Sequence, residues 1–412
     1  MPDPRRIQDN LKALSKIGAT PEGGVTRLAW SEQEREAHRL AIRWMEDAGL
    51  EVTTDAVGNS YGRREGGDPN FPTIMIGSHL DTVNNGGNLD GTLGMVGGLE
   101  VILGLNADGV TTRHPITLMV FAAEEAVRFA DTCMGSKLIT GAMKGELLDQ
   151  LKDAQGISPA EAVRGVGLDP DQIAEARWDP ASIAAYLELH IEQSTVLEKL
   201  GKKIGVVSAI AAATRYRAIL TGSADHSGAT PMGARKDALA AAAEIVLGVE
   251  RIAGSEAGPT TVGTVGILRV KPGAMTVIPG EAELGIDIRD TVPDPKRVAS
   301  AKIVAMMEEV CKRRNIGLQL TQLLDDVPGK MALEVVDVMK ASAEKLGYPH
   351  NAMPSAAGHD ARIMSFVTRA GMIFVPSRGG ISHSPKEWTD PDDILAGIRV
   401  LEAAVRELDR ML

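Results

Sequence analysis

The stretch from Gly77 to Gly94 constrains this chain most, because three side chains that can build a metal site follow a short apolar run. The run Thr73 to Ile76 is typical of a buried strand, and His79, Asp81 and Asp90 come soon after it. Open α/β sheets place their sites where strands end. Residues i and i+2 of an extended chain point the same way, so His79 can bind a metal while Asp81 accepts a hydrogen bond from its other ring nitrogen. Glycines let the following loop bring Asp90 to the same ion, although a glycine-rich surface loop around one buried histidine is the simpler alternative.

Composition limits the class of protein. With 412 residues we expect two to three domains, and 44% apolar residues give ample core, which aliphatic side chains must fill because aromatics make up only 3%. The net charge of −11 argues against nucleic acid as a partner and gives no support for a membrane surface. Two cysteines, Cys133 and Cys311, are too few for a disulfide framework. With no visible signal peptide and no apolar run of membrane-spanning length, we expect a cytoplasmic protein.

The pattern of helices and strands predicts two domains, one inserted into the other. Buried strands alternate with helices in the first half, which indicates an α/β sheet. The pattern changes near residue 210 and returns near 328. We therefore predict an α/β domain formed by residues 1–209 and 328–412, with a central mixed sheet flanked by helices. The inserted α+β domain, residues 210–327, is expected to have strands at 216–220, 261–268, 275–278 and 282–287 and helices at 238–252 and 295–313.

Further residues that can carry chemistry follow other expected strands. Glu124 and Glu125 directly follow an apolar strand, so one can ligate a metal while the other acts as a general base; a solvated charge pair is the alternative. His190 shares one face of a strand with two glutamates, but a lone histidine there is more often structural. His383 lies in a glycine-rich, proline-closed loop that suits either a site or an exposed histidine.

Two residues of the inserted domain are weaker candidates. His226 lies in the segment Asp225-His226-Ser227-Gly228, which by itself favours an ordinary turn. Arg289 follows a strand and can bind a carboxylate through two parallel hydrogen bonds. A salt bridge with Asp287 or Asp290 explains Arg289 equally well.

Taken together, these motifs resemble the M20 metallopeptidase superfamily, and within it the amidohydrolase branch. That branch contains N-carbamoyl-L-amino acid hydrolases, allantoate amidohydrolases and the related β-ureidopropionases. The resemblance covers nearly the whole chain, and an ordered set of this kind is highly specific. The matching segments, in order, are 77–94, 124–129, 188–193, 226–232, 287–290, 358–361 and 380–385.

The resemblance implies a site for two divalent metal ions per subunit. One ion would be held by His79 and His190 and the other by Glu125 and His383, with Asp90 between them. A histidine at position 190 resembles the amidohydrolases, because the peptidases typically carry a carboxylate there. Histidines with shared carboxylates suit zinc, manganese, cobalt or nickel.

The resemblance also implies a catalytic arrangement. Glu124 would be the general base for a water shared by the two ions, and Asp81 would orient His79. The inserted domain would serve as a dimerisation or lid domain. In the expected homodimer, His226 would reach the partner's active site and stabilise the oxyanion. The expected contacts to a small-molecule substrate are Gln193, Arg289, Thr276 and Gly358.

The substrate is the least constrained part of this reading. Thr276 stands where the family has an asparagine, and Ser194-Thr195 replaces a family Gly-Pro. Both changes lie in or near the substrate-binding part. The leading hypothesis is hydrolysis of an N-carbamoyl-L-amino acid; the alternatives are allantoate or another ureido acid, an N-acyl amino acid or a dipeptide. A binding protein without turnover is disfavoured, because neither a metal ligand nor the base is missing.

Overall fold

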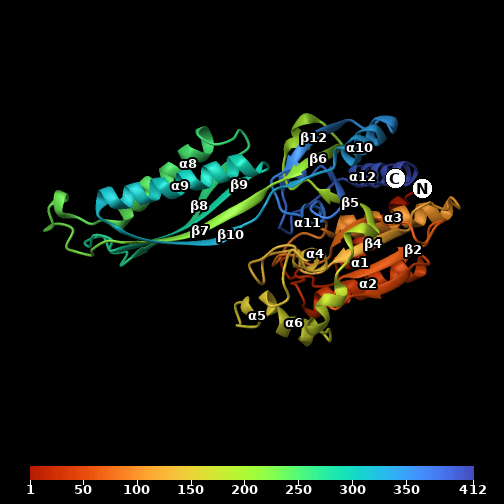
Figure 1. Ribbon diagram of the computed structural model, residues 1–412, viewed down its shortest axis with the longest axis horizontal. Helices are drawn as coiled ribbons and strands as arrows, with labels where there is room; N and C mark the ends of the chain where they lie inside the picture. The colour runs from red at the N-terminus through yellow and green to blue at the C-terminus, as the bar shows by residue number, and fades with distance from the viewer. The chain divides into compact units, whose positions relative to one another are not determined.

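A computed structural model describes residues 1–412 and divides the chain into two compact units. Unit 1 consists of residues 1–209 and 330–412, and unit 2 of residues 210–329. Unit 1 contains a nine-stranded sheet and unit 2 a four-stranded sheet, each packed against helices (Figure 1). The expected fold class, a mixed α/β sheet with an additional four-stranded α+β part, is confirmed.

The sheet of unit 1 is parallel at its centre and antiparallel on both sides. Its strand order is β1-β2-β4-β3-β5-β13-β6-β11, and β12 pairs with β6. Strands β4, β3, β5 and β13 run parallel, whereas β2 and β6 pair antiparallel with β4 and β13. Every residue of β3, β4 and β5 is buried, as expected for parallel strands covered on both faces. The strands are β1 (Glu51–Thr54), β2 (Ser60–Arg64), β3 (Thr73–His79), β4 (Ile116–Phe121), β5 (Ile183–Ile191), β6 (Ile204–Ile210), β11 (Gly329–Lys330), β12 (His350–Ser355) and β13 (Arg369–Val375).

Local signals explain where the helices of unit 1 begin. The Ser31 side chain accepts a hydrogen bond from the backbone N–H of Glu34 and caps α2, and Pro391 occupies the first turn of α12. None of the helices combines the length and the apolar character that crossing a membrane requires. The helices are α1 (Pro4–Leu14), α2 (Glu32–Asp47), α3 (Thr92–Ala107), α4 (Met134–Thr140), α5 (Leu147–Gln150), α6 (Pro159–Gly165), α7 (Val196–Leu200), α10 (Leu333–Lys345), α11 (Asp360–Met364) and α12 (Pro391–Met411).

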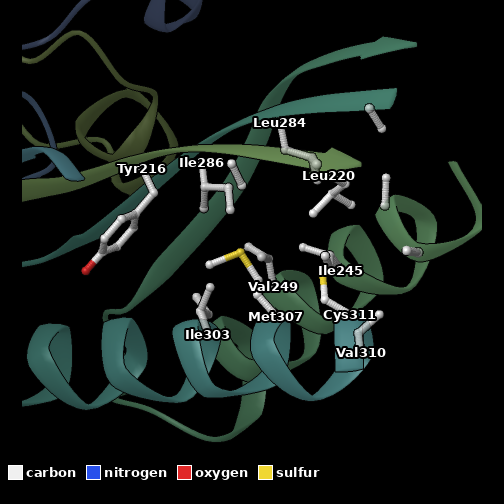
Figure 2. Packing of buried hydrophobic residues seen from close by; sticks show 14 of the residues in the cluster. Tyr216, Leu220, Ile245, Val249, Leu284, Ile286, Ile303, Met307, Val310 and Cys311 are labelled. Carbon is white, nitrogen blue, oxygen red and sulfur yellow. The ribbon is translucent and has the colours of Figure 1, made fainter. Parts of the chain in front are cut away.

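Unit 2 is a four-stranded antiparallel sheet with two long helices on one face. The strand order is β10-β7-β9-β8, and α8 and α9 cover one side of the sheet (Figure 1). Side chains alternate along β9, so that Leu284 and Ile286 point into a core shared with Val249 and Met307 of the helices (Figure 2). Ile288 of the same strand belongs to this core. The elements are β7 (Ala212–Thr221), α8 (Ala238–Ser255), β8 (Val262–Lys271), β9 (Glu281–Asp290), α9 (Pro293–Arg314) and β10 (Gly317–Asp325).

One expected strand of unit 2 is wrong. Residues 275–278 form a turn, in which the N–H of Val277 bonds the carbonyl of Ala274 at 3.2 Å, and only an isolated bridge joins Val277 to His226. Between Gly273 and Pro279 the run is too short to extend this bridge into a strand, and Met275 is fully exposed. The fourth strand is β10, whose leucines at 318 and 320 alternate with polar residues at the edge of the sheet.

Candidate functional site

The candidate site lies at the carboxyl ends of the four parallel strands of unit 1. His79 is the last residue of β3, and Glu124 and Glu125 follow β4. His190 is the penultimate residue of β5, and His383 lies in the loop after β13. Parallel strands present their carboxyl ends at one edge of the sheet, so the fold brings together residues about 300 positions apart in sequence.

Asp90 reaches this edge through a tight turn at Gly91. Gly91 has φ 63° and ψ −49°, and the N–H of Thr92 bonds the carbonyl of Asp90 at 2.6 Å across it. This geometry is close to the strained γ-turn that L-residues rarely adopt. A Cβ at position 91 would lie 2.5 Å from the ring atoms of His79. Both the backbone and the packing therefore require glycine beside His79.

Two histidines meet one oxygen of Asp90. The Oδ1 atom of Asp90 lies 3.0 Å from His190 Nε2 and 3.5 Å from His79 Nε2. The ligand atoms of these three buried residues lie within 4.8 Å of one another. They form a first candidate metal group.

The other oxygen of Asp90 faces a second group. Asp90 Oδ2 and Glu125 Oε1 each lie 3.2 Å from His383 Nε2. The ligand atoms of these three residues also lie within 4.8 Å of one another. Asp90 offers one oxygen to each group, which is the arrangement expected of a residue shared by two ions.

Asp81 acts mainly on the backbone that carries the two glutamates. Its carboxylate accepts hydrogen bonds from the N–H groups of Glu124 at 3.0 Å and Glu125 at 2.9 Å. Nδ1 of His79 lies nearer to the backbone carbonyl of Asp81, at 3.1 Å, than to its carboxylate, at 3.4 Å. Asp81 thus contacts His79 through both its main chain and its carboxylate, and the same carboxylate fixes the segment after β4.

Glu124 and Glu125 point to different partners, as expected for adjacent residues. Glu124 Oε2 lies 3.9 Å from His79 Nε2, and its Oε1 accepts the thiol of Cys133 at 3.1 Å. Burial raises the pKa of Glu124 well above its usual value, and the neighbouring charge of Glu125 adds to the rise. A carboxylate with a raised pKa, placed beside the candidate metal groups, is suited to accept and return a proton.

The electrostatics of the cluster fit a cation. Burial disfavours the charged form of His79, but hydrogen bonds to Asp81 and Asp90 outweigh it and raise the pKa well above the usual value. The hydrogen bonds with Asp90 and Glu125 raise the pKa of His383 to about 11. Protons on these rings balance the buried carboxylates, and a divalent ion can take over that role. Imidazoles with shared carboxylates are the donors that divalent transition metals prefer.

Several residues around this cluster were not expected there from the sequence. Gln193, expected to bind substrate, donates to Asp90 Oδ2 at 2.7 Å and thus lies beside the candidate metal groups. His359 joins Glu188 and His190 in a third close group, but Glu188 already accepts hydrogen bonds from two side chains and a backbone N–H. The pattern of a single sequence does not single out the missed residues, which are Cys133, His359, Ser382 and Glu387.

Two candidate residues of unit 2 lie next to each other. His226 is exposed, and its Nδ1 accepts hydrogen bonds from the N–H groups of Gly228 at 3.0 Å and Ala229 at 3.1 Å. A ring nitrogen that accepts is unprotonated, so Nε2 carries the hydrogen and is a donor. The carbonyl of Thr276 accepts from the N–H of Ser227 at 3.0 Å, which holds Thr276 beside His226.

The remaining two candidates are in different environments. Arg289 donates to Asp287 at 2.7 Å, so the salt bridge considered from the sequence is formed, and Arg215 shares the same carboxylate at 2.8 Å. Gly358, in unit 1, precedes α11 and has open space where a Cβ would stand.

Comparison with known proteins gives the family. Residues 75–407 match the model of Peptidase family M20/M25/M40. The chain is 41% identical over 403 residues to an N-carbamoyl-L-amino acid amidohydrolase of Geobacillus stearothermophilus, covering 98% of each chain. It is 35% identical over 404 residues to the allantoate amidohydrolase of Escherichia coli K12, covering 98% of this chain and 97% of that one.

A solved structure agrees with these sequence matches. The crystal structure of an amidase of the hydantoinase/carbamoylase family from Burkholderia multivorans superposes with a TM-score of 0.90 at 35% identity. The match covers 99% of this chain and 98% of that chain. The resemblance seen in the sequence motifs is confirmed: the chain belongs to the M20/M25/M40 peptidase family of metal-dependent hydrolases, and within it to the amidohydrolase branch.

Proposed function

We propose that this enzyme hydrolyses the ureido C–N bond of an N-carbamoyl-L-amino acid. The products are the free amino acid and carbamic acid, which decays to carbon dioxide and ammonia. The observation that carries the proposal is the pair of candidate metal groups around Asp90, with Glu124 beside them. The relative from Geobacillus stearothermophilus, named for this activity and matching almost end to end, favours this substrate class.

Two divalent ions per subunit would be held by the two groups. His79 and His190 would bind one ion, Glu125 and His383 the other, and Asp90 both. Such ions, when bound, polarise the substrate carbonyl and lower the pKa of a coordinated water. Zinc, manganese, cobalt and nickel all suit this donor set.

Glu124 would act as the general base and then as the acid. It takes a proton from the attacking water as the C–O bond forms, and passes this proton to the leaving nitrogen as the C–N bond breaks. The raised pKa of Glu124 makes its carboxylate a better proton acceptor in the first step. Asp81 holds the backbone of Glu124 in place for both steps.

His226 and Arg289 would act on the substrate from unit 2. The N–H at Nε2 of His226 is oriented by two backbone N–H groups on Nδ1 and can donate to the developing oxyanion. Arg289 would bind the substrate carboxylate through parallel hydrogen bonds from its planar guanidinium group. Gln193, Thr276 and Gly358 would complete the substrate contacts.

A homodimer is the proposed assembly, with His226 reaching the partner's active site. The strand β8 lies at the edge of the sheet of unit 2, where its outer backbone groups can pair with another strand. It exposes Val262, Ile267 and Leu268. An exposed edge with apolar side chains favours association with a second copy.

Allantoate and other ureido acids are the second candidate substrates, because a relative named allantoate amidohydrolase also matches almost end to end. The test is ammonia and amino-acid release by metal-loaded enzyme from N-carbamoyl-L-amino acids, their D-forms, allantoate, N-carbamoyl-β-alanine and dipeptides. We expect turnover of the L-forms, which Glu124→Gln should abolish. The control is Glu100→Gln, which should retain turnover; Glu100 is a buried glutamate of α3 that pairs with Arg6 of α1. Turnover of allantoate alone would favour the second candidate, and no turnover on the panel would refute both.

A further inference from the structure

Glu387 is a buried carboxylate bound to the backbone of Asp90. Its side chain is largely inaccessible, and its Oε1 accepts hydrogen bonds from the N–H groups of Leu89 at 2.8 Å and Asp90 at 3.1 Å. A buried carboxylate is costly unless hydrogen bonds compensate for the lost water. Here the compensation comes from the backbone that carries the residue shared by the two candidate metal groups.

The second oxygen of Glu387 binds the loop that carries His383. Its Oε2 accepts the hydroxyl of Ser382 at 2.9 Å, and the same hydroxyl lies 3.0 Å from Asp90 Oδ2. Asp90 and Glu387 are 297 residues apart in sequence. One side chain therefore connects the segment of Asp90 with the segment of His383.

The local chain does not hold His383 in place by itself. His383 has φ 54°, a left-handed conformation that non-glycine residues rarely adopt, and its side chain is 48% exposed. Such a conformation persists only where the surroundings fix it. The neighbouring Glu387 is itself tightly packed, since a Cβ at Gly87 would lie 2.1 Å from Glu387 Oε1.

We propose that Glu387 is a positioning residue that holds His383 against Asp90 and thereby sets the affinity for the ion of the Asp90–Glu125–His383 group. The inference rests on the two-ion site of the proposed function. Glu387 is not a member of either group of candidate ligands, so it acts through the residues it binds. Losing such an outer hydrogen-bond partner typically weakens metal binding about 10- to 100-fold.

Two substitutions separate the position of Glu387 from its charge. Glu387→Ala removes all three hydrogen bonds. Glu387→Gln keeps them, because the amide oxygen accepts the two N–H groups and the amide nitrogen donates to the hydroxyl of Ser382. If positioning is the role of Glu387, the glutamine variant rescues what the alanine variant loses.

Asp409→Ala is the matched control. Asp409 is a buried carboxylate of α12 that accepts the N–H groups of Arg113 at 3.0 Å and His114 at 2.8 Å, 296 and 295 residues away in sequence. Its loss breaks a long-range link of the same kind away from the candidate ligands. The comparison therefore separates a local effect on the site from general destabilisation.

The experiment is calorimetric titration of metal-free full-length protein with Mn²⁺, with unfolding measured in parallel. His383→Ala identifies the binding step that belongs to the second group. We expect Glu387→Ala to lose affinity in that step by about 10- to 100-fold, with a smaller change in the other step. Glu387→Gln and Asp409→Ala should bind both ions as the parent does.

Several results would overturn the inference. They are parental binding of both ions by Glu387→Ala, equal losses in Glu387→Gln and Glu387→Ala, and the same loss in Asp409→Ala. Fewer than two ions bound by the parent protein would overturn the two-ion site and this inference together. Failure of the substrate panel with the expected binding pattern intact would refute only the proposed reaction, because binding is measured without turnover.

Discussion

Replacing Gly91 with alanine should displace His79 and impair the site while leaving the fold in place. The added Cβ would lie 2.5 Å from the Cε1, Nδ1 and Nε2 atoms of the ring, whereas ordinary contact begins at 3.4 Å. The ring must therefore move by about 1 Å, or the turn between Asp90 and Thr92 must open. Either movement separates His79 from Asp90.

The expected magnitude follows from this displacement. A misplacement of about 1 Å in a catalytic arrangement costs on the order of 100-fold in rate. The γ-turn conformation of position 91 adds about 1–3 kcal/mol of backbone strain for an L-residue, which lowers the free energy of unfolding. We therefore expect a roughly 100-fold lower kcat/KM and weaker binding of the ion held by His79 and His190.

The assay combines turnover, metal binding and denaturant unfolding, with two controls. Gly109→Ala places alanine at φ +62° with no atom within 4 Å of its Cβ, so it measures the cost of a positive φ without a clash. His79→Ala combined with Gly91→Ala removes the ring that the new Cβ would meet. In metal-free protein, Gly91→Ala should destabilise less in the His79→Ala background than alone.

Parental activity and metal binding in Gly91→Ala would refute this reasoning. An equal loss of activity in Gly109→Ala would also refute it, because that variant carries no clash with His79. Additive stability effects of Gly91→Ala and His79→Ala would show that the ring and the new Cβ do not meet.

Three further predictions concern pH, the core and a buried cation. Because the pKa of His383 is raised to about 11, a metal ion bound by the Asp90–Glu125–His383 group must displace its proton. The apparent affinity for this ion should therefore rise about tenfold per pH unit between pH 7 and 9. Calorimetry in buffers of different ionisation enthalpy measures this, and a pH-independent affinity would contradict it. Met307→Ala should lower the free energy of unfolding by about 2–5 kcal/mol in denaturant titrations, since the side chain is fully buried in the core of unit 2, and a loss below about 1 kcal/mol would contradict the packing. Arg27→Met should lower the free energy of unfolding by about 2–4 kcal/mol and weaken metal binding. The reason is that the buried guanidinium of Arg27 donates to the carbonyl of Leu80 and the hydroxyl of Thr92, at the two ends of the Asp90 loop. Unchanged unfolding and metal binding would contradict this prediction.

The parts of the fold with strong local signals could be predicted from the sequence. The fully buried runs that became β3 and β4, and the serine cap of α2, each carry their own pattern. The segment 275–278 misled because apolar β-branched residues favour a strand whether or not a partner strand is near. The strand β10 was missed, although leucines at 318 and 320 alternate with polar residues, because an edge strand buries little.

The candidate site divides in the same way. Histidines and acids next to predicted strand ends could be selected from the sequence, because topology then brings the strand ends together. The sequence does not predict which oxygen of Asp90 faces which histidine, because this depends on side-chain geometry between residues about 300 positions apart. The role of Glu387 has no local signal at all, because it arises from contacts with Leu89, Asp90 and Ser382.

Anomalous diffraction from crystals of the manganese-loaded protein would locate the two proposed ions. We expect two peaks per subunit, one beside His79 and His190 and the other beside Glu125 and His383, with the carboxylate of Asp90 between them. A single peak, or peaks away from Asp90, would contradict the two-ion site on which the proposed reaction depends.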